Sequence, residues 1–260
     1  MTEFSQQDLT GSRFFRVDLS DTEFDRVDLS GARFRGSWGQ GVVLRGVEFE
    51  DVDLDGEIRN FRINGVDVAP LVRAELDRRE PERVLMRPTD PAGFRQAWQL
   101  IEQRWSETVA RARRLPPERL DESVDGEWSF LQTLRHLVFA TDSWLRRGVQ
   151  GEPAPWHPLG LPWEEAPDGL DVPRDLAARP SLDEVLAMRA DRMRGMREYL
   201  EQLTEEQLAA DTVVVDQPGW PPPRSFPVQE CLRIVLNEEY QHRRYAERDL
   251  AVLEGKIAGA

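Results

Sequence analysis

Hydrophobic residues recur at every fifth position through the first part of the chain. The series starts at Phe4 and Leu9 and continues to Leu54, and small or β-branched residues stand two positions before most of its members. A spacing of five matches neither the period of a helix, about 3.6 residues, nor the period of a strand, about two. It predicts a square coil in which each side takes five residues. In such a coil the Phe or Leu fills the axis and the intervening charged residues face water.

This segment resembles the pentapeptide-repeat family, whose members form a right-handed quadrilateral β-helix. The resemblance covers residues 2–56, and Gly39 is the one clear break, because an aromatic residue or leucine is expected there. About eleven repeats, at about four per coil, give fewer than three coils. We therefore predict a short β-helical domain at residues 1–56, with both ends of the stack open.

Residues 57–88 are predicted to form a connector. Within it, Asn64-Gly65 interrupts a stretch of alternating hydrophobic and polar residues, which is the signal for a tight hairpin turn. Pro70 suits the first turn of a short helix, where a missing backbone N–H costs nothing. The connector is therefore expected to hold a hairpin and one short helix.

From Thr89 onward the hydrophobic spacing becomes helical, and it predicts four long helices within residues 89–260. Two capping boxes and one proline mark the starts of the second, third and fourth helices: Ser129 with Gln132, Ser181 with Glu184, and Pro227. The fourth helix is expected to end near Gly255. A segment of about 30 residues, rich in proline and tryptophan, separates the second helix from the third. The predicted fold class is α+β: a short quadrilateral β-helix followed by a four-helix bundle with one long crossover loop.

Charge and cysteine content narrow the classes of function. The 48 acidic residues outnumber the 34 lysines and arginines, so the net charge is −14, which disfavours a nucleic-acid partner. No apolar run approaches the ~20 residues that cross a bilayer, and the first residues lack the pattern of a signal peptide. We therefore expect a cytoplasmic protein with no membrane partner. The single Cys231 excludes an internal disulfide framework.

Two of the predicted helices carry candidates for a metal site. His136, in the second helix, lies on a face of small or uncharged side chains, away from the hydrophobic stripe. Glu238 and His242, in the fourth helix, are four residues apart and so project from one side, at the edge of its stripe. A buried carboxylate is costly unless it is paired or binds a cation. A divalent metal held by two histidines and one carboxylate explains this pattern, and zinc, iron and nickel all accept such ligands.

Several alternatives accompany this site. Glu239 is a rival to Glu238 as the carboxylate ligand, because it is three residues from His242 and near the centre of the stripe. A salt bridge to an arginine is the alternative role for Glu238. Tyr245 is a candidate catalytic residue that donates a hydrogen bond at the site, with core packing as its alternative.

Three further residues with aromatic rings lie outside the predicted helices. His157, in the proline-rich loop, is either a lid residue or a solvent-facing loop histidine. Trp128 and Trp220, just before the second and fourth helices, are expected to close the end of the bundle or to contact substrate.

The segments RHLVFATDSWL (135–145) and LNEEYQHRRYAERDL (236–250) resemble the DinB/YfiT-like superfamily of metal-binding bundles. The resemblance covers residues 90–254. Members commonly bind zinc or nickel through one histidine on the second helix and a pair of residues four apart on the last. The mycothiol-dependent branch can have Glu followed by His in that pair. The resemblance therefore implies His136, Glu238 and His242 as metal ligands, and mycothiol or a relative as co-substrate.

Two functional hypotheses follow. The first is a metal-dependent transferase that uses a low-molecular-weight thiol on an electrophilic small molecule, because a cation makes thiolate available at neutral pH. We expect this enzyme to be a homodimer. The alternative is a non-catalytic interaction protein, in which the solenoid docks a partner and the bundle dimerises.

Overall fold

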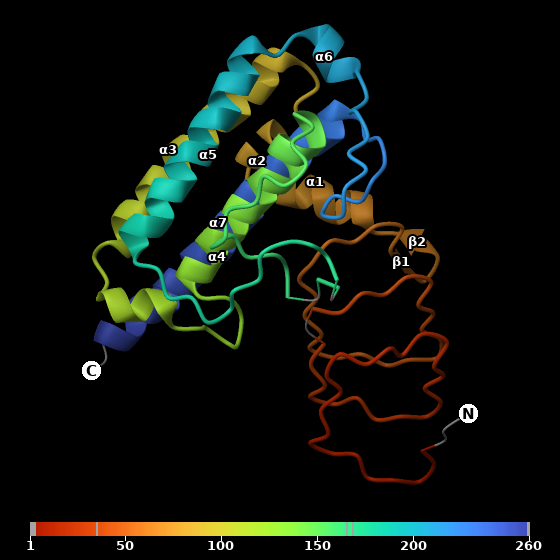
Figure 1. The fold of residues 1–260 in the computed structure, drawn as a ribbon. Coiled ribbons are helices and arrows are strands. Elements are labelled where there is room, and N and C mark those ends of the chain that lie inside the picture. The colour runs from red at the N-terminus through yellow and green to blue at the C-terminus, as the bar shows by residue number, and fades with distance from the viewer. Residues whose placement is uncertain (1–3, 35, 165, 168, 259–260) are drawn as a thin grey trace. The chain divides into compact units, whose positions relative to one another are not determined.

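The computed structural model describes residues 4–34, 36–164, 166–167 and 169–258. The chain divides into two compact units, residues 1–59 and residues 60–260 (Figure 1). Of the predicted repeats, Thr2, Glu3 and Arg35 lie outside the described residues. In the described part of the chain, no helix is both long enough and apolar enough to span a membrane.

The backbone of the first unit repeats every five residues, and Figure 1 shows it as a coil of stacked turns. One residue in five has a left-handed backbone, with φ between 52° and 76° at each such position from Gln6 to Asp51. Five of these positions are glycines, which adopt this conformation without steric cost: Gly11, Gly31, Gly36, Gly41 and Gly46. The predicted period of five is therefore present in the backbone itself.

The structure does not show the predicted quadrilateral β-helix, however. Residues 4–34 and 36–61 contain no β-strand. The side chains expected to fill the axis are exposed, at 63% for Phe4, 42% for Leu9 and 74% for Phe34. In a solenoid each repeat buries its hydrophobic face only against its neighbours. A stack of so few coils offers each axial side chain little surface to pack against.

The second unit begins with the predicted hairpin and short helix. Strands β1 (Arg62–Ile63) and β2 (Val66–Asp67) pair antiparallel across Asn64 and Gly65, whose φ angles are 50° and 83°. Two successive positive φ angles are those of the type I′ turn that Asn-Gly favours. Helix α1 (Ala69–Arg79) follows with a proline in its first turn, and α2 (Glu82–Leu85) comes next.

Four long helices form a bundle in the second unit. They are α3 (Pro91–Ala112), α4 (Phe130–Thr141), α5 (Leu182–Gln202) and α7 (Val228–Ala258). Both α3 and α4 pack against α5 and α7, and the hydrophobic faces of all four meet in one core. The side chains of Ser129 and Ser181 cap α4 and α5 as predicted, each in a complete capping box.

The second long helix changes its winding part-way. The sequence predicts one helix to about Arg147, but from Asp142 to Val149 the chain forms a π-helix, η2. Asp142 is fully buried there. Its carboxylate accepts hydrogen bonds from Arg192 at 2.9 and 3.1 Å and from the backbone N–H of His157 at 3.0 Å. These partners on α5 and on the following loop hold the wider turn in place.

The connections between helices are longer than predicted. Besides the expected crossover at residues 150–181, the chain takes residues 203–227 to pass from α5 to α7, and this second connection includes α6 (Glu205–Ala209). A short 3₁₀-helix, η1 (Pro117–Asp121), lies between α3 and α4. The bundle therefore has two long connections.

Two buried arginines fasten these connections to the bundle. Arg135, on α4, donates to the carbonyl oxygens of Leu159 and Ala178 at 2.8 and 3.1 Å and is 1% exposed. Arg147, on η2, donates to the carbonyl oxygens of Val215 and Pro221 at 3.3 and 3.2 Å. In the pattern of α4, Arg135 lies on a charged stripe apart from the hydrophobic face, and such a stripe is predicted to face water. The crossover instead covers this stripe, and its backbone carbonyls compensate the buried charge.

Candidate metal centre

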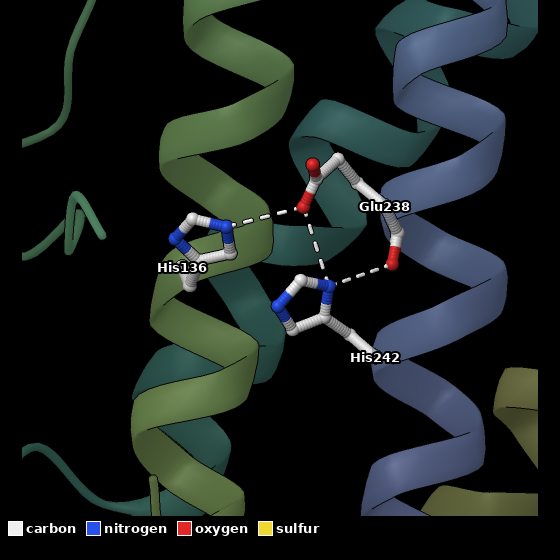
Figure 2. A group of neighbouring side chains, drawn as sticks. All are labelled: His136, Glu238 and His242. Atoms are coloured by element: carbon white, nitrogen blue, oxygen red, sulfur yellow. Dashed lines mark hydrogen bonds and ion pairs between the residues drawn. The ribbon is translucent and has the colours of Figure 1, made fainter. Parts of the chain in front are cut away.

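His136, Glu238 and His242 converge between α4 and α7 (Figure 2). One ligand atom from each residue can be chosen so that all three atoms lie within 4.8 Å of one another. The Oε2 atom of Glu238 lies 3.2 Å from Nε2 of His136 and 3.3 Å from Nδ1 of His242. The structure thus brings together the three residues that the sequence predicted as metal ligands.

The crossover loop orients the His136 ring. Nδ1–H of His136 donates to the carbonyl oxygen of Leu161 at 3.0 Å, and the N–H of Leu161 donates back to the carbonyl of Arg135 at 3.2 Å. A carbonyl oxygen only accepts, so Nδ1 of His136 carries a proton, and Nε2 is the nitrogen that faces Glu238. A hydrogen bond on the far nitrogen is the arrangement that fixes the tautomer of metal-binding histidines.

The helical turn of α7 orients His242. Its Nδ1 lies 2.9 Å from the carbonyl oxygen of Glu238, one turn earlier in the same helix. Donation from Nδ1–H leaves the lone pair on Nε2, and Figure 2 shows that nitrogen on the side of the ring facing His136. Two imidazoles from different helices therefore border the same carboxylate.

The surroundings set the charges of these groups. Burial acts to raise the pKa of Glu238, but the hydrogen bond from His136 and the charges of both imidazoles outweigh it and lower this pKa below 4.5. Burial, followed by the charge of His136, lowers the pKa of His242 to about 4. At neutral pH the carboxyl group is therefore ionised and His242 is neutral, and these are the forms that bind a metal.

The donor set fits a divalent cation. An ionised carboxylate only accepts hydrogen bonds, and so does the unprotonated nitrogen of an imidazole. Nε2 of His136 lies 3.2 Å from Oε2 of Glu238, so a cation between them can take the place of the proton that they share. Two imidazole nitrogens and one carboxylate oxygen are the protein ligands of open zinc sites and of non-haem iron sites.

Glu239, the rival ligand, is bound elsewhere. Its carboxylate accepts two hydrogen bonds from Arg189 of α5, at 2.8 and 3.1 Å. The two side chains are 1% and 4% exposed, and the Arg189 guanidinium also stacks over the Trp105 ring at 4.8 Å. The salt bridge considered for Glu238 is therefore made by its neighbour. An arginine compensates the burial of Glu239, and Glu238 is the carboxylate that faces both histidines.

Family comparison agrees with this architecture. The sequence profile of the DinB superfamily matches residues 100–246, which include all three members of the cluster. The chain belongs to the DinB superfamily. The pentapeptide-repeat profile matches residues 2–37 in eight copies. No curated protein and no solved structure is similar enough to the chain to count as a match.

The contacts of three other candidate residues of this DinB-superfamily chain, Tyr245, Cys231 and His157, are structural. The Tyr245 ring lies 6.0 Å from that of His242, edge to face, with Arg248 stacked over it at 5.5 Å. These are packing contacts, and a catalytic role for Tyr245 stays a prediction. Burial, with the charge of Glu230, raises the pKa of Cys231 to about 12, so this thiol is not a nucleophile. His157 is partly buried in the crossover, where its Nδ1 accepts the N–H of Leu159 at 3.1 Å and its own backbone N–H donates to Asp142 at 3.0 Å.

Sequence reasoning missed three features that organise the site. These are the carbonyl of Leu161 behind His136, the Arg189 partner of Glu239, and the contact of Trp128 with both histidines. Every residue has a backbone carbonyl, so the sequence does not indicate which one accepts the hydrogen bond from His136. Trp128 did carry a signal, since it follows Asp125-Gly126, a dipeptide that favours a tight turn.

The lowered pKa of His242 predicts acid sensitivity of the metal-free protein. The unfolded imidazole has a pKa of 6.5 and the folded one about 4, so the unfolded chain binds more protons between these values. The free energy of unfolding therefore has its full value above pH 6.5 and falls as the pH drops towards 4. We expect His242 to contribute about 2 kcal/mol to this loss by pH 5. Urea unfolding of the wild type and His242→Gln at pH 7.5 and pH 5 measures it. Equal losses in the two proteins would show that His242 titrates normally.

Proposed function

We propose that this protein is a metal-dependent transferase that joins a low-molecular-weight thiol to an electrophilic small molecule. The observation that carries the proposal is the convergence of His136, Glu238 and His242 on one point between α4 and α7. Membership of the DinB superfamily supports a metal site in this bundle. The resemblance to its mycothiol-dependent branch supports the choice of thiol, through the Glu-then-His order on the last helix.

In this proposal the three residues would hold the metal, with zinc the first choice and nickel or iron as alternatives. Nε2 of His136, a carboxylate oxygen of Glu238 and the ring of His242 supply the ligand atoms. Two neutral imidazoles and one carboxylate bring a single negative charge, so a divalent cation leaves the site with net positive charge. That charge favours the thiolate form of a thiol that coordinates it.

The chain's own residues would keep this site selective. Leu161 fixes the ring of His136 from behind, and Arg189 keeps Glu239 away from the site. The ring contacts of Trp128 and Tyr245 with His242 shield part of the cluster from water. The side chains of His136 and His242 are 9% and 19% exposed, and that of Glu238 is 27% exposed, which leaves a restricted approach for a small molecule.

Conjugation of chlorodinitrobenzene tests the proposal. The thiolate sulfur forms a bond to the ring carbon that carries chlorine, the carbon–chlorine bond breaks, chloride leaves, and the thiol proton goes to the buffer. We expect turnover with mycothiol that is lost on treatment with a chelator, restored by zinc or nickel, and absent in His136→Ala. Turnover that persists unchanged in the chelated protein would contradict metal dependence, and metal binding without conjugation of any thiol would contradict the transferase.

The proposal also includes a cellular compartment, reaction partners and an oligomeric state. One cysteine, buried and free, suits a reducing compartment such as the cytoplasm. The partners are a thiol and a small electrophile, and the proposed active form is a homodimer. Light scattering of the purified full chain measures the last point directly, and a mass of 29.9 kDa would contradict the dimer.

A second candidate function is non-catalytic interaction with another protein. The observation that favours it is the exposure of large apolar side chains in the first unit, including Trp38 at 90%, Val43 at 67% and Phe15 at 65%. Under this alternative the solenoid binds a partner and no thiol is consumed. Loss of partner binding in Trp38→Ser, together with no turnover in the conjugation assay, would favour the interaction protein over the enzyme.

A further inference from the structure

Trp128 contacts both histidines of the candidate metal centre. Its ring centre lies 4.7 Å from that of His136, tilted by 43°, and 6.2 Å from that of His242, stacked within 24°. The two imidazoles lie 4.8 Å apart. All three separations fall within the range of attractive aromatic pairs, about 4.5–7 Å. One indole therefore joins a ring on α4 to a ring on α7.

The local chain fixes the position of this indole. Asp125 and Gly126 have φ angles of 52° and 75°, and the N–H of Glu127 donates to the carbonyl of Val124 at 2.9 Å. These features form a tight turn that ends directly before Trp128. The next residue, Ser129, caps α4. Trp128 thus stands between a turn and a helix cap, and its backbone has little freedom.

A salt bridge ties the same turn to the last helix. Arg248 of α7 donates to the carboxylate of Glu127 at 2.5 Å, and the same guanidinium stacks over the Tyr245 ring at 5.5 Å. Tyr245 in turn meets the edge of His242. A series of contacts therefore links the turn to Arg248, then to Tyr245, and finally to His242, on which Trp128 stacks. The start of α4 and the side chains of α7 together place the indole.

The hydrogen bonds to backbone carbonyls alone leave each imidazole free to tilt. His136 is held at Nδ1 by Leu161, and His242 at Nδ1 by its own helix. The second side-chain torsion of histidine has broad minima, so a ring held at one atom can still tilt. A flat ring against both imidazoles restricts that tilt.

We propose that Trp128 is a positioning residue of the metal centre, which holds the two imidazoles at the mutual angle needed to share one ion. The inference rests on the metal site of the proposed function and is independent of the thiol chemistry. The proposal assigns this effect to the flat aromatic face of Trp128. Phenylalanine at this position should therefore preserve the metal affinity, and leucine, which is also apolar but not flat, should lower it.

Nickel binding to three variants tests this role. We expect Trp128→Leu to lower the affinity for nickel(II) by about 10- to 100-fold, as loss of other residues that orient metal ligands does, and Trp128→Phe to keep the affinity of the wild type. Trp144→Leu is the matched control, because Trp144 packs against Trp220 and Phe226. Equal affinity in Trp128→Leu and the wild type, or equal losses in the leucine and phenylalanine variants, would overturn the role.

Tryptophan fluorescence gives a second readout that does not need Trp128→Leu to fold. Nickel(II) quenches an indole in contact with its ligands far more than distant ones. Of the eight tryptophans, Trp128 should account for most of the quenching, so Trp128→Phe should lose it and Trp144→Phe should keep it. Unchanged quenching in Trp128→Phe would overturn the contact. A wild type that binds neither nickel nor zinc would instead refute the metal centre, and the positioning role with it.

Discussion

Replacing Glu238 by glutamine is expected to abolish stoichiometric metal binding. The change keeps the volume of the side chain but removes the negative charge that Nε2 of His136 and Nδ1 of His242 face at 3.2 and 3.3 Å. Loss of a residue that only orients a ligand costs about 10- to 100-fold in metal affinity, and loss of the ligand itself should exceed about 100-fold. Calorimetric titration with zinc of the chelator-stripped protein measures it.

Two further glutamates provide matched controls for this substitution. Glu230 is exposed in the first turn of the same helix, so Glu230→Gln should bind zinc as the wild type does. Glu239→Gln should also retain zinc, because its carboxylate binds Arg189 and not the histidines. Zinc affinity that survives in Glu238→Gln but disappears in Glu239→Gln would show that the ligand was assigned to the wrong glutamate.

Replacing Arg189 by methionine is expected to destabilise the bundle by about 3–5 kcal/mol, the usual cost of removing one partner from a buried ion pair. Arg189 and Glu239 are 4% and 1% exposed, so the remaining carboxylate has no access to water. Glu239 can then stay buried only by taking up a proton. Urea unfolding at pH 7.5 measures the change. The double variant Arg189→Met with Glu239→Gln should recover part of it, since no charge is left buried.

Arg197 offers the control for Arg189, on the same helix and also paired with a glutamate. Its partner is Glu102, and the two side chains are 49% and 21% exposed. An exposed ion pair contributes about 0–1 kcal/mol, so Arg197→Met should have little effect. If both methionine variants lost the same free energy, the Arg189–Glu239 pair would not be the buried bridge that the structure shows.

Local patterns in the sequence predicted the elements that place the site. The capping boxes at Ser129 and Ser181 set the starts of α4 and α5, because a cap depends on residues only three apart. The spacing of Glu238 and His242 fixed their common direction for the same reason. The helical register was therefore enough to identify Glu238 and His242 as candidates, and both lie together with His136 in the structure.

Features that depend on distant segments were not predictable in this way. Arg189 lies 50 residues from Glu239, and no local pattern pairs them. Nothing in the sequence of α4 shows that the crossover covers Arg135. In the first unit the period of five predicted the turns of the backbone. It did not predict how few neighbours a short stack gives to Phe4 or Phe34.

Anomalous diffraction from crystals grown with zinc tests the metal centre most directly. Data collected on both sides of the zinc absorption edge should show one strong peak per chain, about 2.0–2.2 Å from a nitrogen of His136, a nitrogen of His242 and a carboxylate oxygen of Glu238. An ion bound to Glu239, or three side chains that keep their mutual hydrogen bonds with no peak between them, would contradict the account.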